Sequence, residues 1–294
     1  MHPITRYFVV ACFCCWYSLG AYASPDDIAQ DSCFYNLDSA RVHPQKVALL
    51  FINNNGLKGL PEDIKKFPNM RYLFAQFNQL STLPDWLPQC QALRHLSVSD
   101  NQFTEFPPVL CQMPDLLTID LGQNYIKQLP DAIKDMIHLQ YLQLAGNQIS
   151  VLPSAVYQLQ NLVELRLRSN QLSELPPHID KLTKLEILCV GNNRITQLPN
   201  ELCQLHSLNY LSLFLNRLEA LPPDICQLRR LTYIAVFSNR LTELPECLLQ
   251  LPELNIINAG NNEYSQANEK KYNQYRTDDR NVFVEKHMDM SYFH

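Results

Sequence analysis

The hydrophobic positions of this chain repeat with a period of 23 residues. From Val47 to about Asn262, each unit has an L-x-L centre in which apolar and polar residues alternate. This period of two is typical of a short β-strand with its leucines on one side. A proline follows each strand, where no ladder hydrogen bond is lost, and begins an irregular or short helical segment. The pattern therefore predicts stacked coils, each with one strand.

Asparagine marks one place in all ten units, and proline marks another place in nine of them. Ten asparagines are spaced 23 residues apart, at Asn55, Asn78, Asn101, Asn124, Asn147, Asn170, Asn193, Asn216, Asn239 and Asn262. Nine of the 19 prolines follow them by six residues, at Pro61, Pro84, Pro107, Pro130, Pro153, Pro176, Pro199, Pro222 and Pro245. An amide both donates and accepts hydrogen bonds, so it can satisfy backbone groups of neighbouring coils. We interpret the asparagines as structural and not as a ligand-binding ladder.

The unit that begins at Leu162 reads L-x-x-L-x-L-x-x-N-x-L-x-x-L-P-x-x-I-x-x-L-x-x. With this motif the chain resembles the leucine-rich repeat family, in the 23-residue class found in bacterial and eukaryotic interaction proteins. The resemblance implies an α/β solenoid, or horseshoe, with a parallel concave sheet, an irregular or short-helical convex side and a cap at each end. Strands ~4.8 Å apart would join the leucines of neighbouring coils into one core.

The sequence divides into four segments. Residues 1–23 are predicted to be a signal peptide, because Arg6 precedes an apolar run from Tyr7 to Tyr17 and Ala21-Tyr22-Ala23 supplies a small-x-small cleavage pattern. A membrane span is the alternative, but the apolar run is short for one. Ten coils occupy residues 47–262 between an N-terminal cap at 24–46 and a C-terminal cap at 263–294.

Both caps have sequence features of their own. The N-terminal cap resembles a degenerate helical half-turn with apolar contacts from Leu37, Ala40 and Val42. The C-terminal cap is predicted to hold a helix over Ser265–Tyr275 and a strand over Val282–Val284. A detachable interaction tail is the alternative interpretation of this end.

The third, fifth, seventh and eighth places of each unit should project from the concave face. We predict a partner-binding surface there, made of Tyr72, Phe74, Phe77, Tyr141, Glu164, Arg166, Arg168, Tyr210, Phe214, Leu215, Tyr233 and Phe237. Its aromatic residues form two patches that we expect to be exposed, roughly 29 Å apart. We expect Arg166 and Arg168, which lie between the patches, either to bind carboxylates of a partner or to pair with Glu164. Aromatic residues also suit sheet surfaces for structural reasons, and this alternative stays open.

Catalysis and metal binding find little support. His95, Ser97, Ser99 and Asp120 project on one face, but residues two apart on a strand lie ~7 Å from each other, and no strained nucleophile turn is indicated. We predict no catalytic residues. The seven cysteines outside residues 1–23 contain no C-x-x-C or other zinc pattern, so we predict no metal. Cys203 and Cys226 share one phase of the repeat, and free thiols are favoured over a disulfide between them.

Composition narrows the class of partner. With 24 Lys plus Arg against 29 Asp plus Glu, the net charge is −5, which disfavours nucleic acid. Only 7 glycines in the chain disfavour a glycine-rich nucleotide site, and no cofactor is predicted. The hydrophobic fraction of 46% excludes a disordered chain.

We therefore predict a monomeric, non-catalytic module that binds a protein or peptide on its concave face. Its expected location is secreted or periplasmic after signal cleavage, with membrane contact only during export. One alternative is a secreted bacterial effector that is delivered to a host cell and engages a signalling protein there. Another is a surface or adhesion protein that recognises glycans by stacking on exposed rings.

Overall fold

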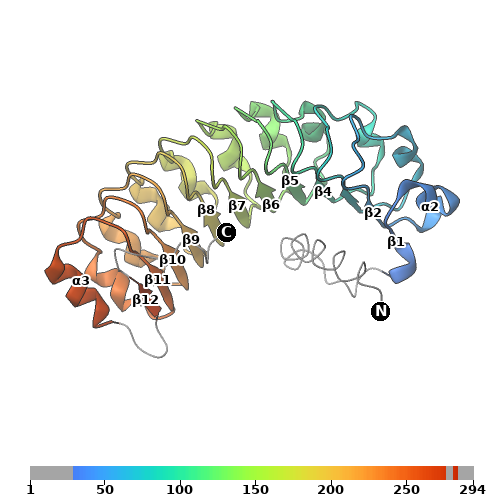
Figure 1. Ribbon diagram of the computed structural model, residues 1–294. Coiled ribbons are helices and arrows are strands. Elements are labelled where there is room, and N and C mark those ends of the chain that lie inside the picture. The colour runs from blue at the N-terminus through green and yellow to red at the C-terminus, as the bar shows by residue number, and fades with distance from the viewer. Residues whose placement is uncertain (1–28, 276–280, 284–294) are drawn as a thin grey trace.

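The computed structural model describes residues 29–275 and 281–283, and the predicted signal peptide lies outside them. Within these ranges, twelve strands form one parallel sheet in chain order, from β1 to β12. Figure 1 shows the coils stacked into an arc with the strands along its inner side. The predicted solenoid with a concave parallel sheet is confirmed.

The strands follow the 23-residue period of the sequence. From β2 to β11, each residue of a strand pairs with the residue 23 positions later, as Leu165 does with Leu188. The strands are β1 (Cys33–Phe34), β2 (Leu49–Phe51), β3 (Tyr72–Phe74), β4 (His95–Ser97), β5 (Thr118–Asp120), β6 (Tyr141–Gln143), β7 (Glu164–Arg166), β8 (Ile187–Cys189), β9 (Tyr210–Ser212), β10 (Tyr233–Ala235), β11 (Ile256–Asn258) and β12 (Asn281–Phe283).

Short 3-10 helices form the convex side, and a proline precedes most of them. Pro176, for example, has a φ of −63° and an extended ψ, and η9 begins directly after it. The helices of the coils are η4 (Glu62–Lys66), η5 (Leu87–Gln89), η6 (Pro108–Gln112), η7 (Asp131–Asp135), η8 (Ser154–Gln158), η9 (Pro177–Lys181), η10 (Asn200–Gln204), η11 (Pro223–Gln227) and η12 (Glu246–Gln250). Two more, η2 (Gln30–Ser32) and η3 (Pro44–Lys46), precede the coils.

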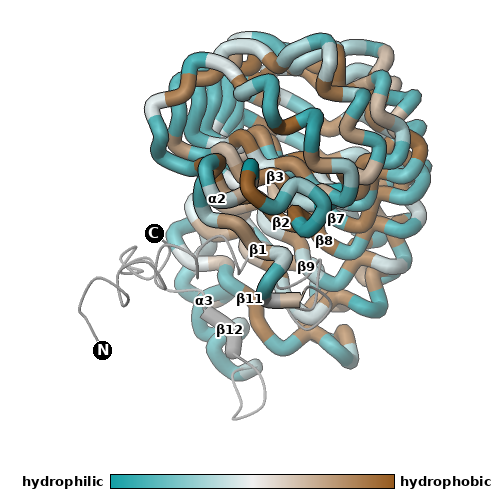
Figure 2. The backbone as a smooth tube through the Cα atoms, turned by 90° about the vertical axis from the view of Figure 1, so that its right-hand side faces the viewer, coloured by the Kyte–Doolittle hydropathy of each residue, from teal (hydrophilic) through white to brown (hydrophobic). Residues whose placement is uncertain are grey.

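The core lies between the sheet and the convex helices. Leu165, Leu167 and Ile179 of one coil are fully buried, and equivalent residues of the other coils continue the same core. In Figure 2, hydrophobic and hydrophilic stretches alternate around each coil. Because each coil buries its leucines only against its neighbours, the array gains stability from stacking.

The repeated asparagines connect neighbouring coils. The Asn170 side chain donates to the carbonyls of Leu144 and Leu167 at 2.9 and 3.1 Å, and it accepts the Ile149 N–H at 2.9 Å. The structural interpretation is confirmed for the nine asparagines from Asn78 to Asn262, whereas Asn55 in the first coil is exposed. The residue before each asparagine turns the chain with a positive φ, and bulky Phe77 and Leu215 do so at 53° and 51°.

At the N-terminal end, α2 (Leu37–Val42) covers the first coil. Asn36 caps this helix by accepting the Ser39 N–H at 2.8 Å. Ala40 is fully buried, whereas Val42 is 69% exposed, so the predicted apolar contact of Val42 is wrong. Ala40 lies on the face of α2 that packs against the core, and Val42 lies on the face toward solvent.

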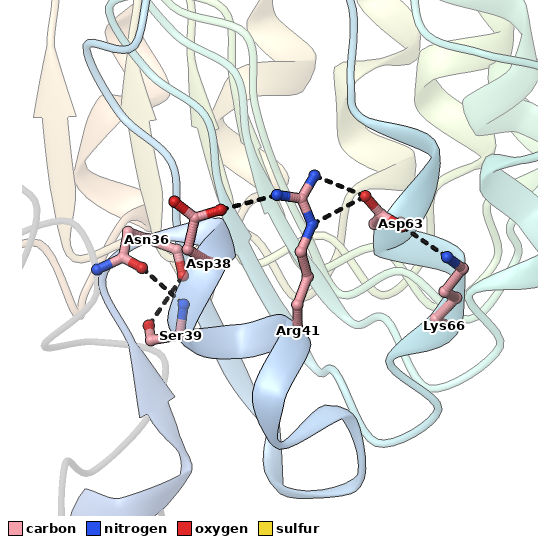
Figure 3. Close-up of polar contacts among 6 residues, drawn as sticks. All are labelled: Asn36, Asp38, Ser39, Arg41, Asp63 and Lys66. Atoms are coloured by element: carbon pink, nitrogen blue, oxygen red, sulfur yellow. Dashed lines mark hydrogen bonds and ion pairs between the residues drawn. The ribbon is translucent and has the colours of Figure 1, made fainter.

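An arginine joins this cap to the first coil. Figure 3 shows Arg41 between Asp38 of α2 and Asp63 of η4, with N–O distances of 2.7 and 2.6 Å. Lys66 lies 2.7 Å from the other oxygen of Asp63. These ion pairs are partly solvated, so we expect them to orient the cap more than to stabilise it.

At the C-terminal end, α3 (Gln266–Asn273) covers the last coils. Ser265 caps it, accepting the Asn268 N–H at 3.2 Å. Tyr272 is buried, and its hydroxyl accepts the Leu244 N–H at 2.7 Å. This helix lies inside the predicted segment, and β12 begins one residue before the predicted strand.

Two cysteines form a disulfide on the convex side. Cys226 of η11 and Cys247 of η12 are bonded, with their Cα atoms 5.7 Å apart. Cys203 is free and buried, so the same-phase pair Cys203 and Cys226 is not the pair that forms.

Across residues 29–275, no helix has the length and apolar character needed to cross a membrane.

Candidate functional site

Three regions succeed one another along the concave face. The N-terminal aromatic cluster contains Leu49, Phe51, Tyr72 and Phe74. The central polar pocket is lined mainly by Gln76, His95, Ser97, Thr118, Asp120, Gln143, Glu164 and Arg166. The C-terminal aromatic shelf, as we name it, consists of Tyr210, Phe214, Tyr233 and Phe237. The register of the sheet sets this order, because equivalent places of neighbouring units lie side by side.

The N-terminal aromatic cluster is buried. Phe51 and Phe74 stack with ring centroids 4.8 Å apart, and Tyr72 stacks on His95 at 4.3 Å. Tyr72 is 8% exposed and Phe74 only 3%. The expectation that these two residues form an exposed patch is therefore wrong, because the rings cover one another across the strands. Phe77 does remain exposed, at the positive-φ place beyond β3.

The C-terminal aromatic shelf has two rows of stacked rings. Tyr210 and Tyr233 lie 4.3 Å apart and are half-buried, and the Tyr233 hydroxyl accepts a hydrogen bond from Asn258 at 3.1 Å. Phe214 and Phe237 lie 4.8 Å apart. Phe214 is half-buried, but Phe237 is 1% exposed, so its predicted exposure is wrong for the same reason of stacking. Burial, followed by the charge of neighbouring Tyr233, raises the pKa of Tyr210.

The edge of the shelf is more open. Leu215 is 36% exposed and follows Phe214 at the positive-φ place. Arg168 is exposed, and its guanidinium lies 5.1 Å from the centroid of the Phe214 ring, which is cation–π geometry.

Gly191 makes this arrangement possible, and the sequence analysis did not single it out. A Cβ atom on Gly191 would lie 2.6 Å from the Phe214 ring. The absence of a side chain lets the ring lean over the neighbouring coil toward Arg168. A signal was available, since few glycines occur in the chain and this one occupies a concave place beside an aromatic column.

Two charged residues between the aromatic regions, Glu164 and Arg166, form an ion pair. Arg166 donates to the Glu164 carboxylate, and Glu164 is 4% exposed. Local pairing, the second of the two predicted roles, thus describes Arg166. Tyr141 lies beside Glu164 in the sheet register and is half-buried. Burial and then the charges of Glu164 and Glu186 raise the Tyr141 pKa.

A chain of hydrogen bonds runs through the central polar pocket. The Gln76 amide donates to the Ser97 hydroxyl at 2.8 Å, and that hydroxyl donates to Asp120 Oδ2 at 2.7 Å. The Gly122 N–H donates to Asp120 Oδ1 at 3.0 Å. Burial raises the Asp120 pKa, and these hydrogen bonds oppose the shift.

His95 takes no part in a serine–histidine–aspartate relay. Its Nδ1 lies 2.9 Å from Thr118 Oγ1, while the Ser97 hydroxyl bonds directly to Asp120. In a catalytic triad the histidine instead lies between serine and aspartate. Burial, with a contribution from Arg94, lowers the pKa of His95 to about 4. In the described part of the chain, no three His, Cys, Asp or Glu side chains gather to hold a metal ion.

Comparison with protein families agrees with this architecture. Residues 127–200 match the model of a leucine-rich repeat region, and residues 91–149 match a leucine-rich repeat model. The chain is a leucine-rich repeat protein. The matched stretches lie inside the ten coils, so the family assignment and the strand register rest on the same residues.

Solved structures resemble this leucine-rich repeat protein over most of its length. A leucine-rich repeat protein of Leptospira interrogans is 28% identical, with a TM-score of 0.65 over 79% of this chain and 71% of that chain. The plant peptide hormone receptor RGFR1, solved with RGF2, is 26% identical, with a TM-score of 0.62 over 70% of this chain and 34% of the receptor chain.

An internalin of Listeria monocytogenes shares the fold. It is 19% identical, with a TM-score of 0.61 over 69% of this chain and 65% of that chain. A search of curated proteins finds no match to this leucine-rich repeat sequence.

Proposed function

We propose that this protein is a non-catalytic interaction module whose concave face binds a protein or peptide. The observation that carries the proposal is the C-terminal aromatic shelf, where half-buried rings and exposed Leu215 and Arg168 lie together. Aromatic and arginine side chains are typical anchors of protein interfaces. The plant receptor of similar fold was solved with the peptide RGF2, which supports the same use of this fold.

The ring geometry favours a protein ligand over a glycan. Sugars stack on open ring faces, but Tyr210 and Tyr233 stack on each other at an interplanar angle of 1°. Phe214 has Phe237 stacked on it and the Arg168 guanidinium over its ring. The surface thus offers ring edges, which suit peptide side chains better than a sugar plane.

The test compares the wild type with Phe214→Ser/Tyr233→Ser as baits for natural partners. An interface centred on the shelf should lose about 2 kcal/mol or more per ring, about thirtyfold in affinity, measured by calorimetry with the recovered partner. Ile137→Ser is the matched control, since Ile137 is 53% exposed and lies outside the concave sheet. Equal affinity of the double variant and the control would place the interface elsewhere.

The proposal includes export before binding. The N-terminal segment has sequence features expected of a signal peptide, which supports export. The Cys226–Cys247 disulfide gives further support, because disulfides persist mainly in oxidising compartments. Intact-mass analysis after native expression should find a protein that begins at or near Ser24. Retained Met1 would contradict export.

A further inference from the structure

The central polar pocket is small and contains an acidic group that forms no ion pair with the described residues. Its cavity volume is about 40 Å³. Sites for whole small molecules are typically ~300 Å³ or more, so this pocket has room only for the end of a side chain. Asp120 projects into it from β5 and, among the ion pairs of residues 29–275, takes part in none.

The hydrogen bonds around Asp120 hold it as an acceptor. The Gln76 amide donates to Ser97, which leaves the Ser97 hydrogen to point at Asp120. Asn53 holds Gln76 in turn, donating to its side-chain oxygen at 3.0 Å and accepting its N–H at 2.8 Å. This chain of neutral donors orients the carboxylate but brings no positive charge to it.

Arg166, a cationic side chain that lines the pocket, pairs with a residue other than Asp120. Arg166 donates to Glu164, and Gln143 of β6 lies between Asp120 and Arg166 in the register. The Gln143 side chain accepts the Ala145 N–H at 3.0 Å and so turns to its own strand. The partly desolvated Asp120 carboxylate thus forms no ion pair with the described residues.

We propose that this pocket receives the cationic end of a lysine or arginine side chain of the bound protein or peptide, with the Asp120 carboxylate as its acceptor. The inference rests on the proposed function and adds the chemistry of one ligand residue. An apolar ligand group here would bury the carboxylate unpaired, and an acidic group would face Asp120 and Glu164 together. The chain's net charge of −5 acts in the same direction.

The experiment uses phage-displayed random 12-residue peptides selected on the purified protein. The best binder is then synthesised with each lysine or arginine replaced in turn by norleucine. We expect one replacement to weaken binding to the wild type about tenfold or more. The same replacement should have little effect on binding to Asp120→Asn, an isosteric variant without the charge. Asp100→Asn, which removes a carboxylate outside the pocket lining, should behave as the wild type.

Selected peptides that bind Asp120→Asn and the wild type equally well, or that contain no basic residue, would overturn this inference. The proposed function would survive if Phe214→Ser still weakened those peptides. Peptides unaffected by both variants would contradict the proposed function as well.

A second measurement needs no variant. Titration with n-butylammonium chloride should shift the NMR signal of the Gly122 amide, which donates to Asp120 Oδ1. Titration with n-butanol is the matched control, and equal shifts with both probes would contradict the inference.

Discussion

The two aromatic regions of the concave face use the same residue types in different places of the repeat. In the N-terminal aromatic cluster the rings occupy the fifth place of β2 and the third and fifth places of β3, and places three and five are two residues apart. In the C-terminal aromatic shelf they occupy the third and seventh places, with Ser212 and Ala235 between the rows. Four residues of strand span ~13 Å, so the second arrangement keeps the two rows apart.

This difference decides which region can serve as a binding surface. In the N-terminal aromatic cluster the third and fifth places together form a small core, in which Phe51 and Phe74 are 8% and 3% exposed. The separated rows leave Tyr210, Phe214 and Tyr233 half-buried. Facing outward from the sheet is thus not sufficient for exposure, and the spacing along the strand matters as much.

The largest expected effect separates the two regions by stability. Phe74→Ala should lower the free energy of unfolding by about 3–5 kcal/mol, since it empties a buried ring site. Phe214→Ala should cost less than about 2 kcal/mol because Phe214 is half-buried. Denaturant unfolding of both variants measures the difference. Equal losses would remove the distinction between a structural and a recognition surface.

Acidification should weaken the N-terminal region in particular. Burial lowers the His95 pKa to about 4, whereas an unfolded histidine titrates near its ordinary 6.5. Protonation therefore favours the unfolded chain as the pH falls from 6.5 toward 4, and up to about 3 kcal/mol of stability is lost.

The measurement is unfolding free energy against pH for the wild type and His95→Gln. The variant should lose less stability than the wild type over this range, and His138→Gln, at an exposed position, serves as the control. Parallel curves for all three proteins would contradict the assigned role of His95.

A methyl group at Gly191 should disturb the C-terminal shelf alone. Gly191→Ala places a Cβ atom 2.6 Å from the Phe214 ring, so the ring must move, at a cost of about 1–3 kcal/mol. Gly59→Ala is the matched control, because a Cβ there meets nothing within 4 Å. Melting temperatures of the two variants should differ, and only Gly191→Ala should weaken a shelf-binding partner.

The smallest expected effect concerns Arg168. Arg168→Ala should cost about 0.5–1 kcal/mol of stability by removing the cation over Phe214. Arg194→Ala, at another exposed arginine, should cost less. Unfolding in low and high salt checks both variants, and equal losses would mean that the contact with Phe214 stabilises nothing.

Much of the fold could be predicted from the sequence, because the 23-residue period determines where the strands lie and how they pair. The spacing of Asn147 and Asn170 sets the strand register, since each asparagine must reach carbonyls of the preceding coil. The two-residue strand β1 lies outside the period and was not predicted.

The candidate site was less predictable because it depends on how side chains of neighbouring coils pack. Tyr72 stacks on His95 and Phe74 stacks on Phe51, and the order of residues in a column does not report how far their rings cover one another. The disulfide was missed for a related reason. Cys226 and Cys247 are 21 residues apart rather than 23, so a search for cysteines of equal phase passes over them.

The constant register also gives this protein a fixed unit of length. Inserting or deleting one complete 23-residue coil would preserve every asparagine contact while it moves the Asp120 pocket and the aromatic shelf apart or together by ~4.8 Å. An extended ligand that reaches both would then have to gain or lose about one and a half residues, at ~3.3 Å per residue. Homologous recombination between coils could therefore retune ligand length in whole steps, with no new packing to evolve.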